Sequence, residues 1–150
     1  MTRSQRIAQL LEVAEARDRN VSRSLSEHRG ALEAAQEQLR ELLGYRDEYA
    51  RQFERTGGGG LPGAQLQDYR LFLDRLNRAI AAQNKRIEAQ QREYESWRQR
   101  WLESHREVAS LDKAVERLRD LERQTSEREE QRRNDELAQR RRGWNGEPRE

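Results

Sequence analysis

Thr56-Gly57-Gly58-Gly59-Gly60-Leu61-Pro62-Gly63 is the stretch that decides the fold, because the chain must leave any helix there. Four consecutive glycines carry a large backbone entropy cost in a helix, and Pro62 has no backbone N–H to donate. A phosphate-binding loop would need Gly-Lys-Ser/Thr after its glycines and a strand before them, and neither is present. We therefore predict a connection over residues 56–63 and no nucleotide site.

Toward the N-terminus of this connection, mostly apolar residues recur at alternating spacings of four and three without a slip in register. Such a heptad repeat is typical of a helix that buries one narrow stripe against a partner helix. We predict this helix over about residues 3–55. Its seam positions are Ile7, Leu11, Ala14, Asp18, Val21, Leu25, His28, Leu32, Ala35, Leu39, Leu42, Arg46, Tyr49 and Phe53.

The same spacing resumes on the C-terminal side of the connection. No Gly or Pro interrupts residues 64–142, and Gly143 is a plausible helix stop, so we predict a second helix over 64–142 and a loose tail over 143–150. After Leu121 the apolar series nearly ends, and the rest of this helix is expected to project as a single polar helix. The second seam is Leu66, Tyr69, Leu73, Leu76, Ile80, Gln83, Ile87, Gln90, Tyr94, Trp97, Trp101, Ser104, Val108, Leu111, Val115 and Leu118.

A short connection between two long heptad segments favours antiparallel neighbours. Folding the chain at residues 56–63 places Val21 opposite Trp97 and His28 opposite Gln90. The predicted fold class is therefore all-α, with one domain over residues 1–150: a long two-helix antiparallel coiled-coil hairpin with a projecting C-terminal helix.

The amino-acid composition agrees with a narrow apolar stripe between two helices, and it argues against some classes of function. The chain is 39% charged and 33% hydrophobic, which leaves either disorder or a few apolar residues gathered on one stripe, and the unbroken heptads favour the stripe. The net charge is only +2, with both signs interspersed, whereas a nucleic-acid-binding helical arm would want a basic stripe. That arm and a homodimeric coiled-coil spacer remain the alternative functions.

No motif of catalytic quality occurs. The chain has no cysteine, and it lacks the His-Glu-x-x-His and Gly-x-Ser-x-Gly patterns of zinc proteases and serine hydrolases. Two histidines, His28 and His105, do not make a metal site. We expect a protein that is no enzyme and has no cofactor or metal. No apolar run is long enough to span a bilayer, which favours a cytoplasmic protein.

One group of apolar residues early in the second helix is wider than the seam requires. Phe72 and Ala79 occupy flanking heptad positions where charged residues are usual. Phe72, Leu76, Ala79 and Gln83 follow one another at helical spacing. This stripe is either a widened core near the connection or a surface for docking a partner.

Three segments give the chain a resemblance to the FliJ family of flagellar export proteins. The first is Leu42-Leu43-Gly-Tyr45-Arg-Asp-Glu-Tyr49, before the glycine-rich break. After it comes Tyr69-x-x-Phe72-Leu73-x-x-Leu76-x-x-Ala79-Ile80. The third is Asn134-Asp135-Glu136-Leu137-Ala138-Gln139-Arg140. The resemblance covers nearly the whole chain.

The resemblance implies a coiled-coil stalk of the flagellar type III export apparatus. Its implied partners are the hexameric export ATPase, the cytoplasmic domain of the export-gate membrane protein, and export chaperones, which it escorts. It also implies that Phe72, Leu76, Ala79 and Gln83 contact the gate, although Gln83 replaces a more usual His. Asp135, Glu136 and Arg140, together with the N-terminal end, are expected to contact the ATPase. The protein is then expected in the cytoplasm, held at the inner face of the cell membrane by its partners.

Overall fold

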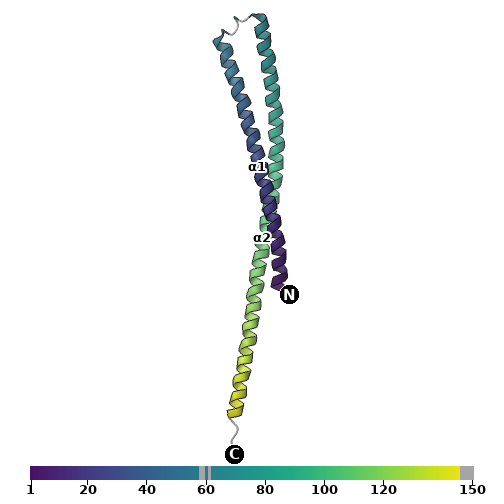
Figure 1. Cartoon of the computed structure of the whole chain (residues 1–150), viewed down its shortest axis with the longest axis vertical. Coiled ribbons are helices and arrows are strands. Elements are labelled where there is room, and N and C mark those ends of the chain that lie inside the picture. The colour runs from purple at the N-terminus through teal and green to yellow at the C-terminus, as the bar shows by residue number, and fades with distance from the viewer. Residues whose placement is uncertain (58–59, 61, 146–150) are drawn as a thin grey trace, which may run out of the picture. The chain divides into compact units, whose positions relative to one another are not determined.

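Two long helices make up the fold, α1 (Arg3–Arg55) and α2 (Gly63–Asn145) (Figure 1). The computed structural model describes residues 1–57, 60 and 62–145, and these residues contain no strand. The expected all-α hairpin is thereby confirmed. The expected stop at Gly143 is wrong, because α2 continues through this glycine to Asn145. Residues 146–150 of the tail predicted over 143–150 lie outside the described residues.

The chain divides into two compact units, each of which contains a segment of both helices. The loop unit is Asp18–Glu103, and the terminal unit is Met1–Arg17 with Ser104–Glu150. Within each unit the α1 segment, purple to blue in Figure 1, lies beside an α2 segment, teal to green. Side-chain contacts in the loop unit show that the two segments run antiparallel, since Tyr49 meets Tyr69 whereas His28 meets Trp97.

The side chains between the helices follow the heptad pattern. Every predicted seam position from Ile7 to Phe53 and from Leu66 to Leu118 is buried or half-buried. The buried apolar residues are Ala14, Leu32, Ala35, Leu76, Ile80 and Val115. Burying a Leu, Ile or Val side chain contributes about 1.5–3 kcal/mol relative to exposure, and burying the methyl group of an Ala contributes less. The narrow seam therefore supplies most of the hydrophobic stabilisation that a chain of this composition can obtain.

Long seam side chains reach further along the partner helix than the expected pairing placed them. Trp97 stacks on His28 with ring centroids 5.4 Å apart, instead of facing only Val21. Trp101 donates its indole N–H to the Ser22 hydroxyl at 3.0 Å. Helical side chains lean toward the N-terminus of their own helix. In an antiparallel pair this lean carries α2 side chains toward higher α1 numbers, which accounts for both contacts.

The N-terminus of α1 is capped by its own chain and by α2. Thr2 and Gln5 form a capping box, since Gln5 N donates to Thr2 Oγ1 at 3.2 Å and Thr2 N donates to Gln5 Oε1 at 2.9 Å. Ser4 is 4% exposed and donates its N–H and hydroxyl to the two carboxylate oxygens of Glu122, at 3.1 and 2.6 Å. These bonds add a polar layer one step beyond the predicted ends of both seams.

The C-terminus of α1 ends at the glycine-rich stretch for a backbone reason. Gly57 has φ +91°, a left-handed conformation that favours glycine and commonly follows the last turn of a helix. The Thr56 hydroxyl donates to the carbonyl oxygens of Gln52 and Phe53, both at 3.0 Å. Pro62 then accepts a bond from Leu66 N at 3.1 Å in the first turn of α2.

Within the terminal unit, the last part of α2, green to yellow in Figure 1, extends past the N-terminal end of α1, and Arg3 of α1 still lines a hollow with Thr125 and Glu129. Every residue from Arg123 to Trp144 is exposed. This segment is therefore stabilised by its own backbone bonds and by local side-chain contacts, such as the Thr125 hydroxyl donating to Leu121 O at 2.9 Å. It presents a polar surface with few apolar residues, as expected from the loss of the heptad pattern.

Candidate partner-binding surfaces

Four aromatic side chains gather where α1 ends and α2 begins. The Tyr69 ring of α2 stacks on Tyr49 and on Phe53 of α1, with centroid distances of 5.0 and 4.0 Å. Phe72 packs on Tyr49 at 4.3 Å with its ring tilted by 43°. Three of these rings belong to seam residues, and the fourth, Phe72, packs against them from a flanking position.

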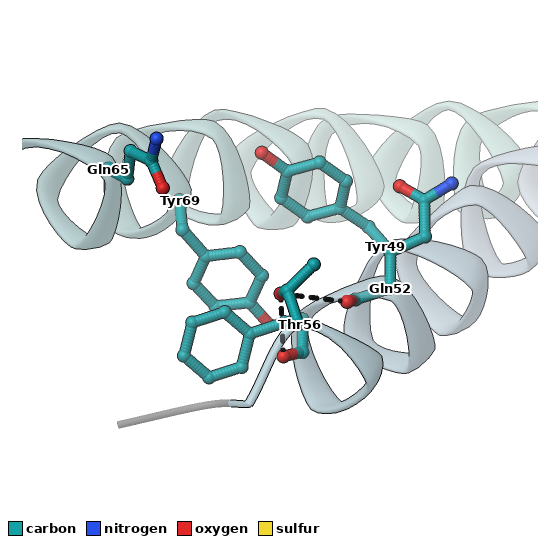
Figure 2. A pocket seen from close by; sticks show the side chains of 6 residues that line it. Tyr49, Gln52, Thr56, Gln65 and Tyr69 are labelled. Carbon is teal, nitrogen blue, oxygen red and sulfur yellow. Dashed lines mark hydrogen bonds between the residues drawn. The ribbon is translucent and has the colours of Figure 1, made fainter. Parts of the chain in front are cut away.

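A shallow hollow of about 220 Å³ opens beside the stacked rings. Figure 2 shows the Tyr49 and Tyr69 rings there, together with the two hydrogen bonds of Thr56 to the backbone of α1. Gln52 and Gln65 complete much of the wall. The hollow carries no ionisable group other than the tyrosine hydroxyls, so it offers shape and stacking rather than acid–base chemistry.

A second hollow, of about 250 Å³, lies along the Phe72 side of the same helix pair. Its apolar walls are Tyr45, Tyr49, Phe72 and Leu76, and its polar walls are Glu48 and Gln52. Tyr45 is 58% exposed and Phe72 is 44% exposed. Two partly exposed aromatic side chains, one from each helix, therefore flank a depression that could accept an apolar side chain of a partner.

The structure places the four residues of the docking stripe in two different environments. Phe72 and Ala79 are exposed on α2, whereas Leu76 and Gln83 are buried at 8% and 4% exposure. Gln83 Nε2 donates to Ala35 O at 2.8 Å and to Gln38 Oε1 at 3.1 Å, both on α1. Leu76 and Gln83 thus hold α2 against α1, and only Phe72 and Ala79 present side-chain surface.

The three residues expected to contact an ATPase all lie in the exposed part of α2. Asp135, Glu136 and Arg140 are open to solvent. Asp135 Oδ1 accepts a bond from Gln131 Nε2 at 3.3 Å. The four-residue spacing of Glu136 and Arg140 puts them on one side of the helix. The segment can therefore offer charges of both signs to a partner surface.

A protein-family model for the flagellar FliJ protein matches residues 3–147. The chain belongs to the FliJ family. It is accordingly a protein related to flagellar protein export. Neither a curated protein nor a solved structure matches the chain.

In this FliJ-family chain, the described residues hold no group of three or more His, Cys, Asp or Glu side chains that could bind a metal ion. No described helix is both long enough and apolar enough to cross a membrane. Every buried side-chain nitrogen or oxygen in the described part of the chain has a hydrogen-bond partner.

Sequence reasoning missed the α1 half of the Phe72 hollow. Tyr45 and Glu48 come from α1, yet the predicted stripe lay on α2 alone. The signal was available, because Tyr45 occupies a position off the heptad seam just as Phe72 does. Applying the same rule to both helices would have identified two exposed aromatic residues, one on each.

Proposed function

We propose that this FliJ-family chain works by binding alone, as a coiled-coil stalk of the flagellar export apparatus. In this role it contacts the hexameric export ATPase and the cytoplasmic domain of the export-gate protein, and it escorts export chaperones. It resides in the cytoplasm and is held at the inner face of the membrane through these partners. Membership of the FliJ family and the two-helix fold support the proposal.

The exposure of Phe72 is the observation that best supports the contact with the gate. Phe72 is 44% exposed although its ring packs on Tyr49, and it lines the same hollow as Tyr45 of α1. An aromatic side chain at such a position gains less from folding than a buried one, and aromatic residues are frequent energetic anchors of protein interfaces. Phe72 therefore contacts the gate directly, and Ala79 extends this contact along α2.

Leu76 and Gln83 support the gate contact from inside. Leu76 is a buried residue that lines the Phe72 hollow, and Gln83 donates a hydrogen bond to Ala35 O of α1. Substituting either residue would change the folding free energy and the binding free energy together. The exposed pair, Phe72 and Ala79, is the proper place for a test.

The ATPase contact uses the exposed segment of α2. Asp135, Glu136 and Arg140 supply charges of both signs there, and the N-terminal turn of α1 belongs to the same terminal unit. Different faces of the helix would meet different subunits of a surrounding ring. Binding free energy would then vary with orientation and bias the ring toward particular conformations.

To test the gate contact, the affinity of the Phe72→Ala and Ala79→Asp variants for the cytoplasmic domain of the export-gate protein is measured by calorimetry. The melting temperature of each variant is measured as well. Phe72→Ala should lower stability by less than the roughly 3–5 kcal/mol of a buried Phe truncation. The same change should weaken gate binding by about 2 kcal/mol or more, as loss of an interface anchor does. Ala79→Asp adds a charge to the same face without emptying the seam and should also weaken binding.

Leu71→Ala is the matched control, because Leu71 is the neighbouring exposed apolar residue at 51% exposure and does not line the hollow. It should leave gate binding unchanged. If folded Phe72→Ala and Ala79→Asp proteins bound the gate as well as wild type does, the stripe would be a widened core rather than a docking surface. Equal losses in all three variants would point to general apolar attraction rather than to this surface.

A further inference from the structure

The last turns of α2 carry a basic face with two exposed apolar side chains along its centre. At 3.6 residues per turn, Arg133, Arg140, Arg141 and Trp144 all fall within roughly 60° of Leu137 around the helix axis. Leu137 is 54% exposed and Trp144 is 80% exposed, and the three arginines are exposed as well. We call these five residues the basic face.

The acidic residues nearest to Leu137 and Trp144 in the sequence point away from the centre of this face, whereas Glu130, two turns before Leu137, lies in line with it. Asp135 falls roughly 160° from Leu137 and Glu136 roughly 100° from it. Within the described residues, the three arginines of the basic face form no ion pair, whereas arginines nearer the seam such as Arg17 and Arg123 do. From Leu137 to Trp144 the sequence holds three arginines and no acidic residue, so this end of the helix carries a surplus of positive charge although the chain as a whole carries only +2.

The arrangement of apolar and basic groups indicates the kind of partner. Leu137 and Trp144 lie in line, with Arg133 and Arg140 on one side and Arg141 on the other. Arginine side chains can extend outward to charged groups while their stems cover apolar surface. Tryptophan favours the boundary between an apolar phase and water. A helix with an apolar line flanked by cations suits the surface of an anionic bilayer.

We propose that the basic face binds anionic phospholipid headgroups directly, with Leu137 and Trp144 entering the outer acyl boundary. This contact goes beyond attachment to the membrane through protein partners. Each arginine near an anionic membrane surface strengthens binding by about fivefold. A single-stranded RNA could also attract the arginines and stack on Trp144, but Leu137 would gain nothing from it. The observations favour the bilayer.

The test measures flotation of the full chain with vesicles of phosphatidylglycerol and phosphatidylcholine in equal parts, and with vesicles of phosphatidylcholine alone. The expected result is binding to the anionic vesicles only, with a blue shift of tryptophan fluorescence. Arg141→Glu should reduce binding by about tenfold or more, since a cation is lost and an anion gained. Trp144→Ser should reduce binding and abolish the blue shift. Arg141 and Trp144 are not among the residues proposed for the ATPase, so both proposals can be judged separately.

Arg132→Glu is the matched control, because Arg132 lies roughly 140° from Leu137 and the substitution makes the same change in net charge. It should lower anionic-vesicle binding by no more than about twofold to threefold. Equal losses for Arg141→Glu and Arg132→Glu would overturn the proposal, because attraction would then depend on net charge alone. Equal binding to both kinds of vesicle would overturn it too. A third outcome would also overturn the proposal: the chain fails to bind vesicles but binds a uridine oligonucleotide, and Arg141→Glu abolishes that binding.

Discussion

At the scale of single residues, the Ser4–Glu122 contact links stability to pH. The Ser4 hydroxyl and then the Ser4 N–H stabilise the ionised carboxylate, so the pKa of Glu122 lies below its ordinary value of 4.5 despite the opposing effect of burial. A carboxyl whose pKa is lower in the folded state adds stability that is complete above its unfolded pKa. That stability is lost as the pH falls from about 4.5 through the folded-state pKa.

Glu122→Gln should therefore weaken the first turn of α1 near neutral pH, and the difference from wild type should shrink in acid. Amide hydrogen exchange of the first helical residues, compared at about pH 6 and about pH 3.5, measures this. Glu127→Gln, an exposed change on the same helix, serves as control and should leave exchange unaltered. A difference between wild type and Glu122→Gln that stays constant across this range would contradict the assignment.

Gln83 illustrates how far a residue pattern predicts a site. Its place in the heptad series predicts burial, and the residue is 4% exposed. The pattern could not say which acceptor would satisfy its amide, because that depends on the distance to Ala35 O across the seam. A buried amide with two partners on α1 defines the alignment of the helices more than it stabilises them. A direct role at a partner surface would require that amide to leave the seam.

At the scale of the helices, the seam was predictable almost residue by residue, because a narrow stripe permits only one register. Its ends were not. Ser4 and Glu122 continue the same spacing by one step, but both are polar, and nothing in a hydrophobic pattern marks a polar layer as buried. Gly143 failed as a helix stop because an exposed glycine costs a helix only about 1 kcal/mol, and, apart from its chain neighbours and the nearby α2 backbone, no described atom lies within 4 Å of the place where its Cβ would be.

The exposed segment of α2 should be removable without loss of stability. Ending the chain after Ser126 deletes no seam residue, and the large apolar residues lost with it, Leu137 and Trp144, are already more than half exposed. The melting temperature measured by circular dichroism should stay nearly the same, since little apolar area is uncovered. Stimulation of the export ATPase should disappear, because Asp135, Glu136 and Arg140 are gone.

A second truncation, after Leu121, is the informative comparison. It also removes Glu122 and so leaves Ser4 without its carboxylate partner. This shorter chain should show faster amide exchange in the first turn of α1 than the chain ending at Ser126. If the chain ending at Ser126 still stimulated the ATPase fully, the assignment of the ATPase contact to the exposed segment would be wrong.

At the scale of the whole molecule, the property that separates a hairpin from a homodimer is that α1 packs against α2 of the same chain. The alternative function of a homodimeric spacer would bring α1 of one copy against α2 of another. Composition and heptad pattern are the same in both cases, since either pairing buries the same stripe. A hairpin predicts that Tyr49 and Tyr69, whose rings are 5.0 Å apart, come from the same chain.

Cysteines in place of Tyr49 and Tyr69 should therefore be joined within one chain by a short bismaleimide linker. The chain has no cysteine of its own, so the two introduced thiols are the only targets. To separate the two topologies, ¹⁵N-labelled and unlabelled protein are mixed before linking, and the linked peptides are analysed by mass spectrometry. A hairpin gives only fully labelled or fully unlabelled products. Arg23→Cys combined with Tyr69→Cys is the control and should give no link within a chain, because Arg23 lies about seven helical turns from Tyr49 along α1. Linked peptides of mixed label from the Tyr49 and Tyr69 positions would mean that copies exchange helices, and the stalk would then be a dimer.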